Sequence, residues 1–126
     1  MPDSGYYEKR PRPQQQQFFM SAVQQRPTVD RVTQIDEHRF IVERAGKSTL
    51  HVYLTNKYLL SVADVMEILA SSEDTNCIVS TMGHNRYSPE AKQYCRELGI
   101  GLFVAPEFLG AVYYDRERFL DYLPPE

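Results

Sequence analysis

Two groups of residues in this 126-residue sequence have the types and spacing that phosphate chemistry needs. In the first, Glu43, His51 and Lys57 fall on one face of a predicted pair of strands, because side chains alternate along a strand. The second is the loop of residues 82–87, in which Arg86 offers a planar guanidinium suited to phosphate and Tyr87 offers a ring that could stack on a base or sugar. A solvated sheet face and an ordinary strand-to-helix loop would contain the same residue types, so both interpretations of each group remain open.

A β-hairpin is predicted to position the first group. Residues 39–44 and 48–56 are rich in β-branched and aromatic residues, and Gly46 between them suits the positive φ of a three-residue turn. This loop length places Val42 opposite Leu50 and makes one face of the hairpin apolar. A loop one residue shorter would mix apolar and polar side chains on both faces, which a buried face does not tolerate.

A strand–helix–strand unit is predicted to position the second group. Residues 77–81 form a short β-branched run, and residues 100–104 form another apolar run. Between them, Ser88 provides the cap of a helix that begins with proline, and Gly99 stands where a left-handed residue ends it. Two strands connected through a helix are expected to pair in parallel, in a right-handed crossover.

Another helix is predicted at residues 61–70, where Ser61 and Asp64 form a reduced capping box. Its predicted apolar stripe consists of Val62, Val65, Met66 and Leu69. Residues 28–37 fit a strand and a short helix equally well. The order of hairpin, helix, strand, helix and strand predicts an α/β fold with one mixed sheet and helices packed on it.

The N-terminal part of the chain has a different composition from the rest. Residues 1–27 contain several prolines and a run of glutamines, which predicts a flexible arm, and residues 28–126 are predicted to form a single domain. Phe18, Phe19 and Met20 are large apolar side chains inside this arm. Either they fold back on their own domain or form a short helix, or they contact a protein partner or a second copy of the chain.

Composition and charge narrow the class of protein. The net charge of −3 argues against a protein that is basic throughout, although a local basic site remains compatible with it. No apolar run approaches the roughly 20 residues that span a bilayer, and no secretory signal is apparent, so we expect a cytoplasmic protein without membrane contact. Cys77 and Cys95 lie within apolar patterns and lack a CxxC spacing, which predicts reduced packing residues.

The sequence resembles the restriction-endonuclease-like (PD-(D/E)xK) superfamily of nucleases, and within it the Mrr-type branch. In that branch a hairpin ends in a strand with a Gln-x-Lys motif before an aromatic residue, and helix, strand, helix and strand follow. Residues 55–58 (Thr-Asn-Lys-Tyr) stand in the place of that motif. Residues 76–81, 88–92 and 99–103 resemble the next strand, helix and strand, so the resemblance covers about residues 38–112. It implies a restriction-endonuclease-like core and phosphodiester cleavage with a divalent metal, usually Mg²⁺.

The sequence departs from this family where the metal would bind. Lys57 matches the lysine of the motif, but the residue two positions before it is Thr55, whose neutral hydroxyl is a poor replacement for a carboxylate ligand of a hard cation. The aspartate expected on the preceding strand is also absent, and the carboxylates nearest to its place are Glu43 and Asp36. The metal site is therefore predicted to be lost, or rebuilt from these displaced carboxylates.

Three hypotheses for function follow from these observations. In the first, a small restriction-endonuclease-like protein acts on or near DNA or RNA without standard metal-dependent cleavage and without a cofactor, contacting nucleic acid through His51, Lys57, Arg86 and Tyr87. In the second, the protein is an active Mg²⁺-dependent endonuclease in which Glu43 and Lys57 are catalytic. In the third, it is a protein-interaction or scaffold subunit that uses its N-terminal arm to bind a protein partner or to form a homodimer.

Overall fold

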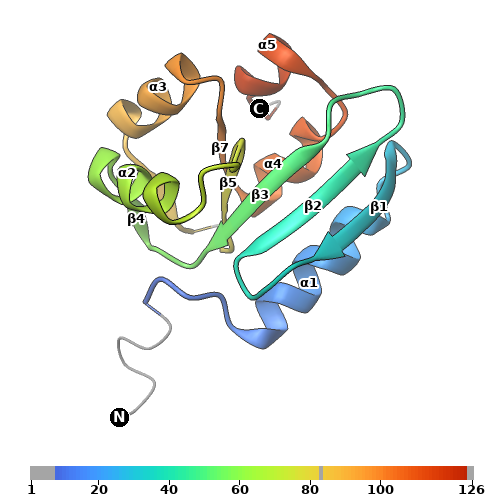
Figure 1. Ribbon diagram of the computed structural model, residues 1–126, viewed down its shortest axis with the longest axis horizontal. Coiled ribbons are helices and arrows are strands. Elements are labelled where there is room, and N and C mark those ends of the chain that lie inside the picture. Colours follow the sequence, from blue (N-terminus) through green and yellow to red (C-terminus); the bar gives the residue numbers. More distant parts are fainter. Residues whose placement is uncertain (1–7, 83, 125–126) are drawn as a thin grey trace.

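The computed structural model describes residues 8–82 and 84–124, which form an α/β arrangement (Figure 1). In chain order its elements are α1 (Pro13–Gln24), β1 (Val29–Gln34), β2 (Arg39–Arg44), β3 (Leu50–Thr55), β4 (Leu59–Leu60), α2 (Val62–Ser71), β5 (Cys77–Ser80), β6 (Arg86–Tyr87), α3 (Pro89–Glu97), β7 (Gly101–Val104), α4 (Ala105–Ala111) and α5 (Arg116–Leu120). The segment that fitted strand and helix equally well is strand β1.

The main sheet is mixed and has five strands in the order β1-β2-β3-β5-β7. The pairs β1–β2 and β2–β3 are antiparallel, and the pairs β3–β5 and β5–β7 are parallel. Strands β4 and β6 form a separate, two-stranded parallel sheet. The hairpin and the strand–helix–strand unit therefore share one sheet, which confirms the predicted α/β class with a mixed sheet.

The predicted register of the hairpin is confirmed. Val42 lies opposite Leu50, and Phe40 lies opposite Val52. Gly46 has a φ of 68°, the left-handed conformation that suits glycine in this turn. Because the register is right, one face of the hairpin is continuously apolar and is buried.

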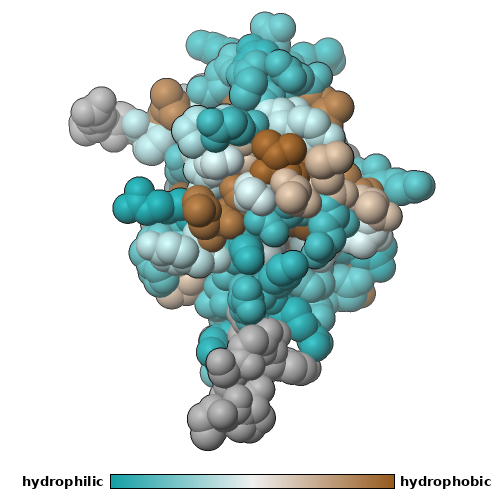
Figure 2. Space-filling model, turned by 90° about the vertical axis from the view of Figure 1, so that its left-hand side faces the viewer, coloured by the Kyte–Doolittle hydropathy of each residue, from teal (hydrophilic) through white to brown (hydrophobic). Residues whose placement is uncertain are grey.

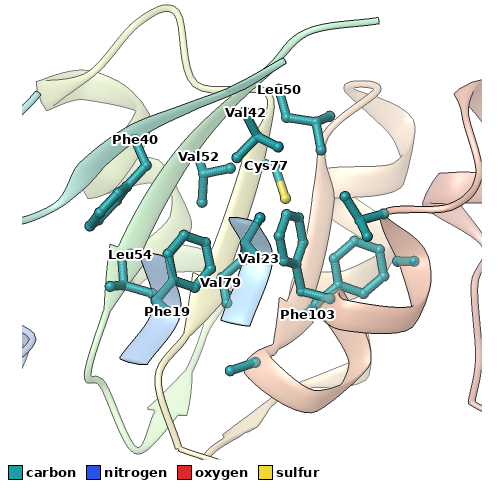
Figure 3. Close-up of a cluster of buried hydrophobic side chains, with 14 of the residues drawn as sticks. Phe19, Val23, Phe40, Val42, Leu50, Val52, Leu54, Cys77, Val79 and Phe103 are labelled. Atoms are coloured by element: carbon teal, nitrogen blue, oxygen red, sulfur yellow. The ribbon is translucent and has the colours of Figure 1, made fainter. Parts of the chain in front are cut away.

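Helices cover both faces of the main sheet. On one face, buried residues of α1, α4 and α5 form a cluster with β2, β3, β5 and β7, and Figure 3 shows Phe19 and Val23 of α1 facing these strands. On the other face, α2 and α3 cover β5 and β7 through a second cluster. Figure 1 shows α2 and α3 on the left of the sheet and α1 beside β1 and β2. The site described below lies at the end of this layered structure.

Residues 13–24 of the predicted arm form helix α1, in agreement with the alternative in which Phe18, Phe19 and Met20 belong to a short helix or fold back on their own domain. Phe19 is only 3% exposed, and its ring lies 5.1 Å from Phe40 and 5.6 Å from Phe108, measured between centroids. Val23, one helical turn later, is fully buried. The apolar pair at i and i+4 docks the helix on the sheet, which stabilises a segment whose average composition is polar. The rest of the predicted arm includes residues 1–7, which lie outside the described residues.

The helix caps are confirmed, but the buried face of α2 differs from the prediction. Ser61 and Asp64 form the capping box of α2, and Ser88 caps α3. In α2, however, the fully packed residues are Val65 and Ile68, and Met66 is 55% exposed. The buried face of α2 is thus rotated around the helix axis relative to the predicted stripe, because α2 packs against both the sheet and α3.

Both cysteines are free and buried, as predicted. Burial raises the pKa of the Cys77 thiol strongly and raises that of Cys95 to about 11, so neither is a ready nucleophile. Among the described residues, none of the helices combines the length and apolar character that crossing a bilayer requires.

Candidate functional site

The carboxyl ends of β3 and β5 enclose a hollow of about 390 Å³ together with the N-terminal part of α1. Its described lining residues are Glu8, Arg12, Gln15, Asn56, Lys57, Tyr58, Met82, His84 and Asn85. These strands are parallel neighbours, so the loops that follow them leave the sheet side by side. Open α/β sheets commonly bind ligands at this end of their strands.

Lys57 follows β3 directly and extends into the hollow, with 26% of its side chain exposed. Thr55, two residues earlier, is buried and donates a hydrogen bond of 2.9 Å from its hydroxyl to the carbonyl of Lys9. The same hydroxyl accepts a bond of 3.3 Å from the backbone N–H of Lys57. Thr55 therefore fixes the backbone around Lys57 and presents no anionic oxygen to the hollow.

A network of hydrogen bonds connects the residues of α1 and of the two loops that line the hollow. The Oδ1 of Asn56 accepts bonds from the Nε2 of Gln15, at 3.3 Å, and from the hydroxyl of Thr81, at 2.6 Å. The same Nε2 lies 3.1 Å from the sulfur of Met82, and the Oε1 of Gln15 accepts from the backbone N–H of Arg12. These contacts connect α1 with the loops after β3 and β5 and pre-organise the site.

The loop after β5 is tied to the loop after β3. The hydroxyl of Ser80 donates to the carbonyl of Lys57 at 3.0 Å and accepts from the Nδ2 of Asn85 at 2.8 Å. Ser80 and Asn85 are both buried, so these bonds satisfy polar groups that water does not reach. As a result, Tyr58 and His84 are held at the rim of the same hollow, with ring centroids 6.2 Å apart.

A segment before α1 crosses this end of the sheet. The carboxylate of Glu8 lies 3.5 Å from the Nζ of Lys57. Lys9 accepts a bond from the backbone N–H of Asn56 and pairs with Glu67 at 3.1 Å. Glu8 is therefore the counter-ion of Lys57, and a bound anion would compete with it.

The donor set of the hollow does not fit a hard divalent cation. Among the described lining residues, Glu8 supplies the one carboxylate, and it pairs with Lys57. The oxygen of Asn56 already accepts two hydrogen bonds. Within residues 8–82 and 84–124, no group of three or more His, Cys, Asp or Glu side chains is close enough to hold a metal ion. The positive charges of Arg12 and Lys57 suit an anion instead.

The structure does not bring Glu43 to Lys57. Glu43 lies near the end of β2 and pairs with Arg31 at 3.1 Å. Val42 is opposite Leu50 at the start of β3, and Lys57 follows the end of that strand. At about 3.3 Å per residue, roughly 20 Å of strand separates the two side chains, which excludes a shared catalytic centre of Glu43 and Lys57. Alternation along a strand predicts which face a side chain occupies, but it gives no position along the sheet.

His51 and Asp36 are also engaged elsewhere. His51 lies near the start of β3, with its Nδ1 3.6 Å from a carboxylate oxygen of Asp74, and so does not join Lys57. Asp36 accepts bonds from the backbone N–H groups of His38 and Arg39 and pairs with the Arg39 side chain at 2.7 Å. Asp36 thus stabilises the turn between β1 and β2 and is not directed at Lys57.

Arg86 and Tyr87 form β6 and have different environments. Arg86 is exposed, and its backbone N–H donates to the carbonyl of Tyr58, which places it beside the hollow. The hydroxyl of Tyr87 donates to Glu107, and the ammonium of Lys92 lies 5.3 Å from its ring centroid. Burial, together with Glu107, raises the pKa of Tyr87. Tyr87 is therefore a packed residue, and the prediction that it contacts nucleic acid is not supported.

Phe18, Phe19 and Met20, the three large apolar residues that were predicted in the N-terminal arm, differ in exposure. Phe19 is buried against the sheet, and Met20 packs partly against the same cluster. Phe18 is 60% exposed. Of these three residues only Phe18 is largely exposed to a partner, because successive side chains of a helix point about 100° apart and Phe18 lies off the buried face.

Several lining residues were not predicted from the sequence. Asn56 and Tyr58 flank Lys57, so the motif itself contained the signal that identifies them. Gln15 carried no comparable signal, because it lies in a glutamine run far from Lys57 in sequence. His84 lies in the loop of residues 82–87 that was predicted as the second candidate site, but nothing in the sequence placed that loop beside Lys57. Comparison of the chain with family models, with curated proteins and with solved structures gave no match in any of the three.

Proposed function

We propose that this protein binds nucleic acid through phosphate, at the hollow beside Lys57, on a restriction-endonuclease-like core that lacks the metal-dependent cleavage of that superfamily. One observation carries the proposal. Lys57 follows β3 at the end of the sheet where β3 and β5 terminate, while the hydroxyl of Thr55, in the place of the metal ligand, is bonded to the backbone.

The order of elements supports the family assignment within this proposal. A hairpin of β2 and β3 ends at the motif, and α2, β5, α3 and β7 follow in the order that the Mrr-type branch has. The parallel pairing of β3, β5 and β7 is compatible with the same core. Fold alone does not define an activity, so the proposal depends on the residues of the hollow.

The chemistry of the hollow favours an anion over a metal. Arg12 and Lys57 provide positive charge, and Asn56, Gln15 and His84 provide polar side chains around it. Charge-assisted bonds from lysine and arginine to phosphate are among the stronger polar contacts in proteins. A hydrolytic metal centre would require several oxygen ligands, and the described lining offers one carboxylate that is already paired.

Binding is tested by fluorescence anisotropy with labelled DNA and RNA oligonucleotides at low salt. Lys57→Ala should weaken binding about tenfold or more, because it removes a charge-assisted bond to phosphate. Lys47→Ala is the matched control, since Lys47 bonds to Thr28 near the opposite end of the hairpin. The proposal fails if the wild-type protein ignores both nucleic acids at low salt, or if the two variants bind alike.

Cleavage is tested separately with supercoiled plasmid in the presence of Mg²⁺ or Mn²⁺. We expect no conversion to nicked or linear forms. Metal-dependent cleavage that disappears in the Lys57→Ala variant would show an active nuclease and would overturn the second half of the proposal.

A further inference from the structure

An exposed aromatic pair stands at the rim of the hollow. Tyr58 is 60% exposed, and the ring of the exposed His84 lies 6.2 Å from it between centroids, with an interplanar angle of 40°. Both residues line the hollow that contains Lys57. The Tyr58 ring remains largely accessible although a tyrosine gains stability from burial, so the core does not explain its position.

The backbone on both sides of this pair is held in place. Tyr58 precedes β4, and its carbonyl accepts a bond of 2.6 Å from the backbone N–H of Arg86 in β6. The residues that follow continue as the β4–β6 ladder, with Leu59 opposite Arg86. On the other strand, Asn85 is anchored through the bond of its side chain to Ser80. The two rings are therefore presented by a fixed framework, which lowers the entropy cost of binding a flat ligand.

The charge of the site is small. Among the described residues that line the hollow, Arg12 and Lys57 carry a permanent positive charge and Glu8 carries a negative one. The whole chain has a net charge of −3. Proteins that bind duplex DNA through its backbone make many more phosphate contacts than two cations allow. A ligand with few contacted phosphates and an accessible base face fits this surface better than a continuous duplex.

We propose that Tyr58 and His84 form a stacking platform for an unpaired base, so that the protein selects single-stranded over double-stranded nucleic acid. This inference rests on the proposed function, because Lys57 would hold the phosphate next to the stacked base. In a duplex the base faces are stacked on one another and cannot reach the rings, whereas every unpaired base has a free face. The two lining cations imply a weak salt dependence, with a slope of log K against log salt of about −1.4.

The test compares a short labelled oligothymidylate with a duplex of the same length, by anisotropy titration at several salt concentrations. Tyr58→Ala should weaken single-strand binding about 5- to 150-fold, the range that follows from 1–3 kcal/mol per stacked base, and should weaken duplex binding by a much smaller factor. Tyr58→Phe should retain the affinity, because the ring and not the hydroxyl stacks. Tyr113→Ala is the control, since this partly exposed tyrosine follows α4 and is absent from the described lining of the hollow.

The outcomes separate the two proposals. If the wild-type protein binds neither form, the proposed function fails and the platform fails with it. If it binds both forms equally and Tyr58→Ala behaves like Tyr113→Ala, the platform is refuted while phosphate binding stands. His84→Ala provides a second variant on the other loop, and an unchanged single-strand affinity in both Tyr58→Ala and His84→Ala would also overturn the inference.

Discussion

The buried ion pair between Arg44 and Asp115 offers the sharpest test of how the C-terminal part is attached. The Arg44 side chain is fully buried and its guanidinium donates to the carbonyls of Ser48, Val112 and Tyr114 as well as to Asp115 at 3.0 Å. Asp115 also accepts from the backbone N–H and the hydroxyl of Ser48. We therefore choose Asp115→Asn, which keeps the size of the side chain and removes its charge.

The magnitude follows from the pKa of Asp115. Burial alone would raise this pKa, but the hydrogen bonds from Ser48 and Arg116 and the charge of Arg44 lower it from 3.8 to about 2. A pKa lowered by this amount corresponds to a stabilisation of the folded state of about 2 kcal/mol. Because the folded-state pKa is depressed, this stability is present in full above pH 4 and is lost as the pH falls through 2. Asp115→Asn should thus lower the free energy of unfolding by about 2 kcal/mol at pH 7.

The assay is urea unfolding followed by circular dichroism at pH 7 and pH 3. The difference in the free energy of unfolding between wild type and Asp115→Asn should shrink to about half at pH 3. At this pH the Asp115 carboxylate is mostly protonated in the unfolded wild-type chain but still mostly ionised in the folded one. Asp30→Asn removes an exposed carboxylate on β1 and is the control, with an expected change within about 0.5 kcal/mol. If the free energy of unfolding of Asp115→Asn differs little from that of wild type at pH 7, or if the difference does not change with pH, the ion pair does not stabilise the fold in this way.

Three further predictions concern packing and the hollow. Phe19→Ala should cost about 3–5 kcal/mol in urea unfolding, whereas the exposed Phe18→Ala should cost little, and equal effects would contradict the docking of α1 on the sheet. Gly101→Ala should cost about 1–3 kcal/mol in the same assay, because an added Cβ would come within 2.5 Å of a phenylalanine ring in α5, and an unchanged midpoint would show unrecognised space there. Glu8→Gln should raise the affinity for an oligonucleotide about two- to fivefold in anisotropy titrations by releasing Lys57 from its counter-ion, an increase that should be absent in a Lys57→Ala background.

Local features of the fold could be predicted because a few neighbouring residues decide them. The turn at Gly46 and the apolar alternation around it set the hairpin register, and a slip would expose a whole face. Ser88 and Gly99 mark the ends of α3 because they satisfy backbone groups within one turn. The buried face of α2 could not be predicted so well, because it depends on how α2 packs against both the sheet and α3. Met66, predicted on that face, is exposed.

The outer surface also shows that hydrophobic periodicity does not predict which apolar residues are buried. Figure 2 views the molecule from the side of α2 and α3, where hydrophobic residues form a central patch among hydrophilic ones. Leu59 of β4 and Met66 of α2 are large apolar residues that are 48% and 55% exposed. Periodicity identifies apolar residues in an element, but it does not say how many of them a neighbour covers.

The sequence by itself determined the α/β class, the hairpin register and the helix caps, because each follows from the alternation, periodicity and capping residues of short segments. It placed Lys57 on a face of the second hairpin strand, whereas in the structure β3 ends at Thr55. Only the tertiary structure decided which side chains share a site. Strand pairing placed Glu43 at the far end of the hairpin from Lys57. The packing of α1 and of the loop after β5 brought Gln15 and His84 to the hollow from distant segments. The physical reason is that a site is a set of distances between elements, and those distances are set by how the sheet is ordered and how its faces are covered.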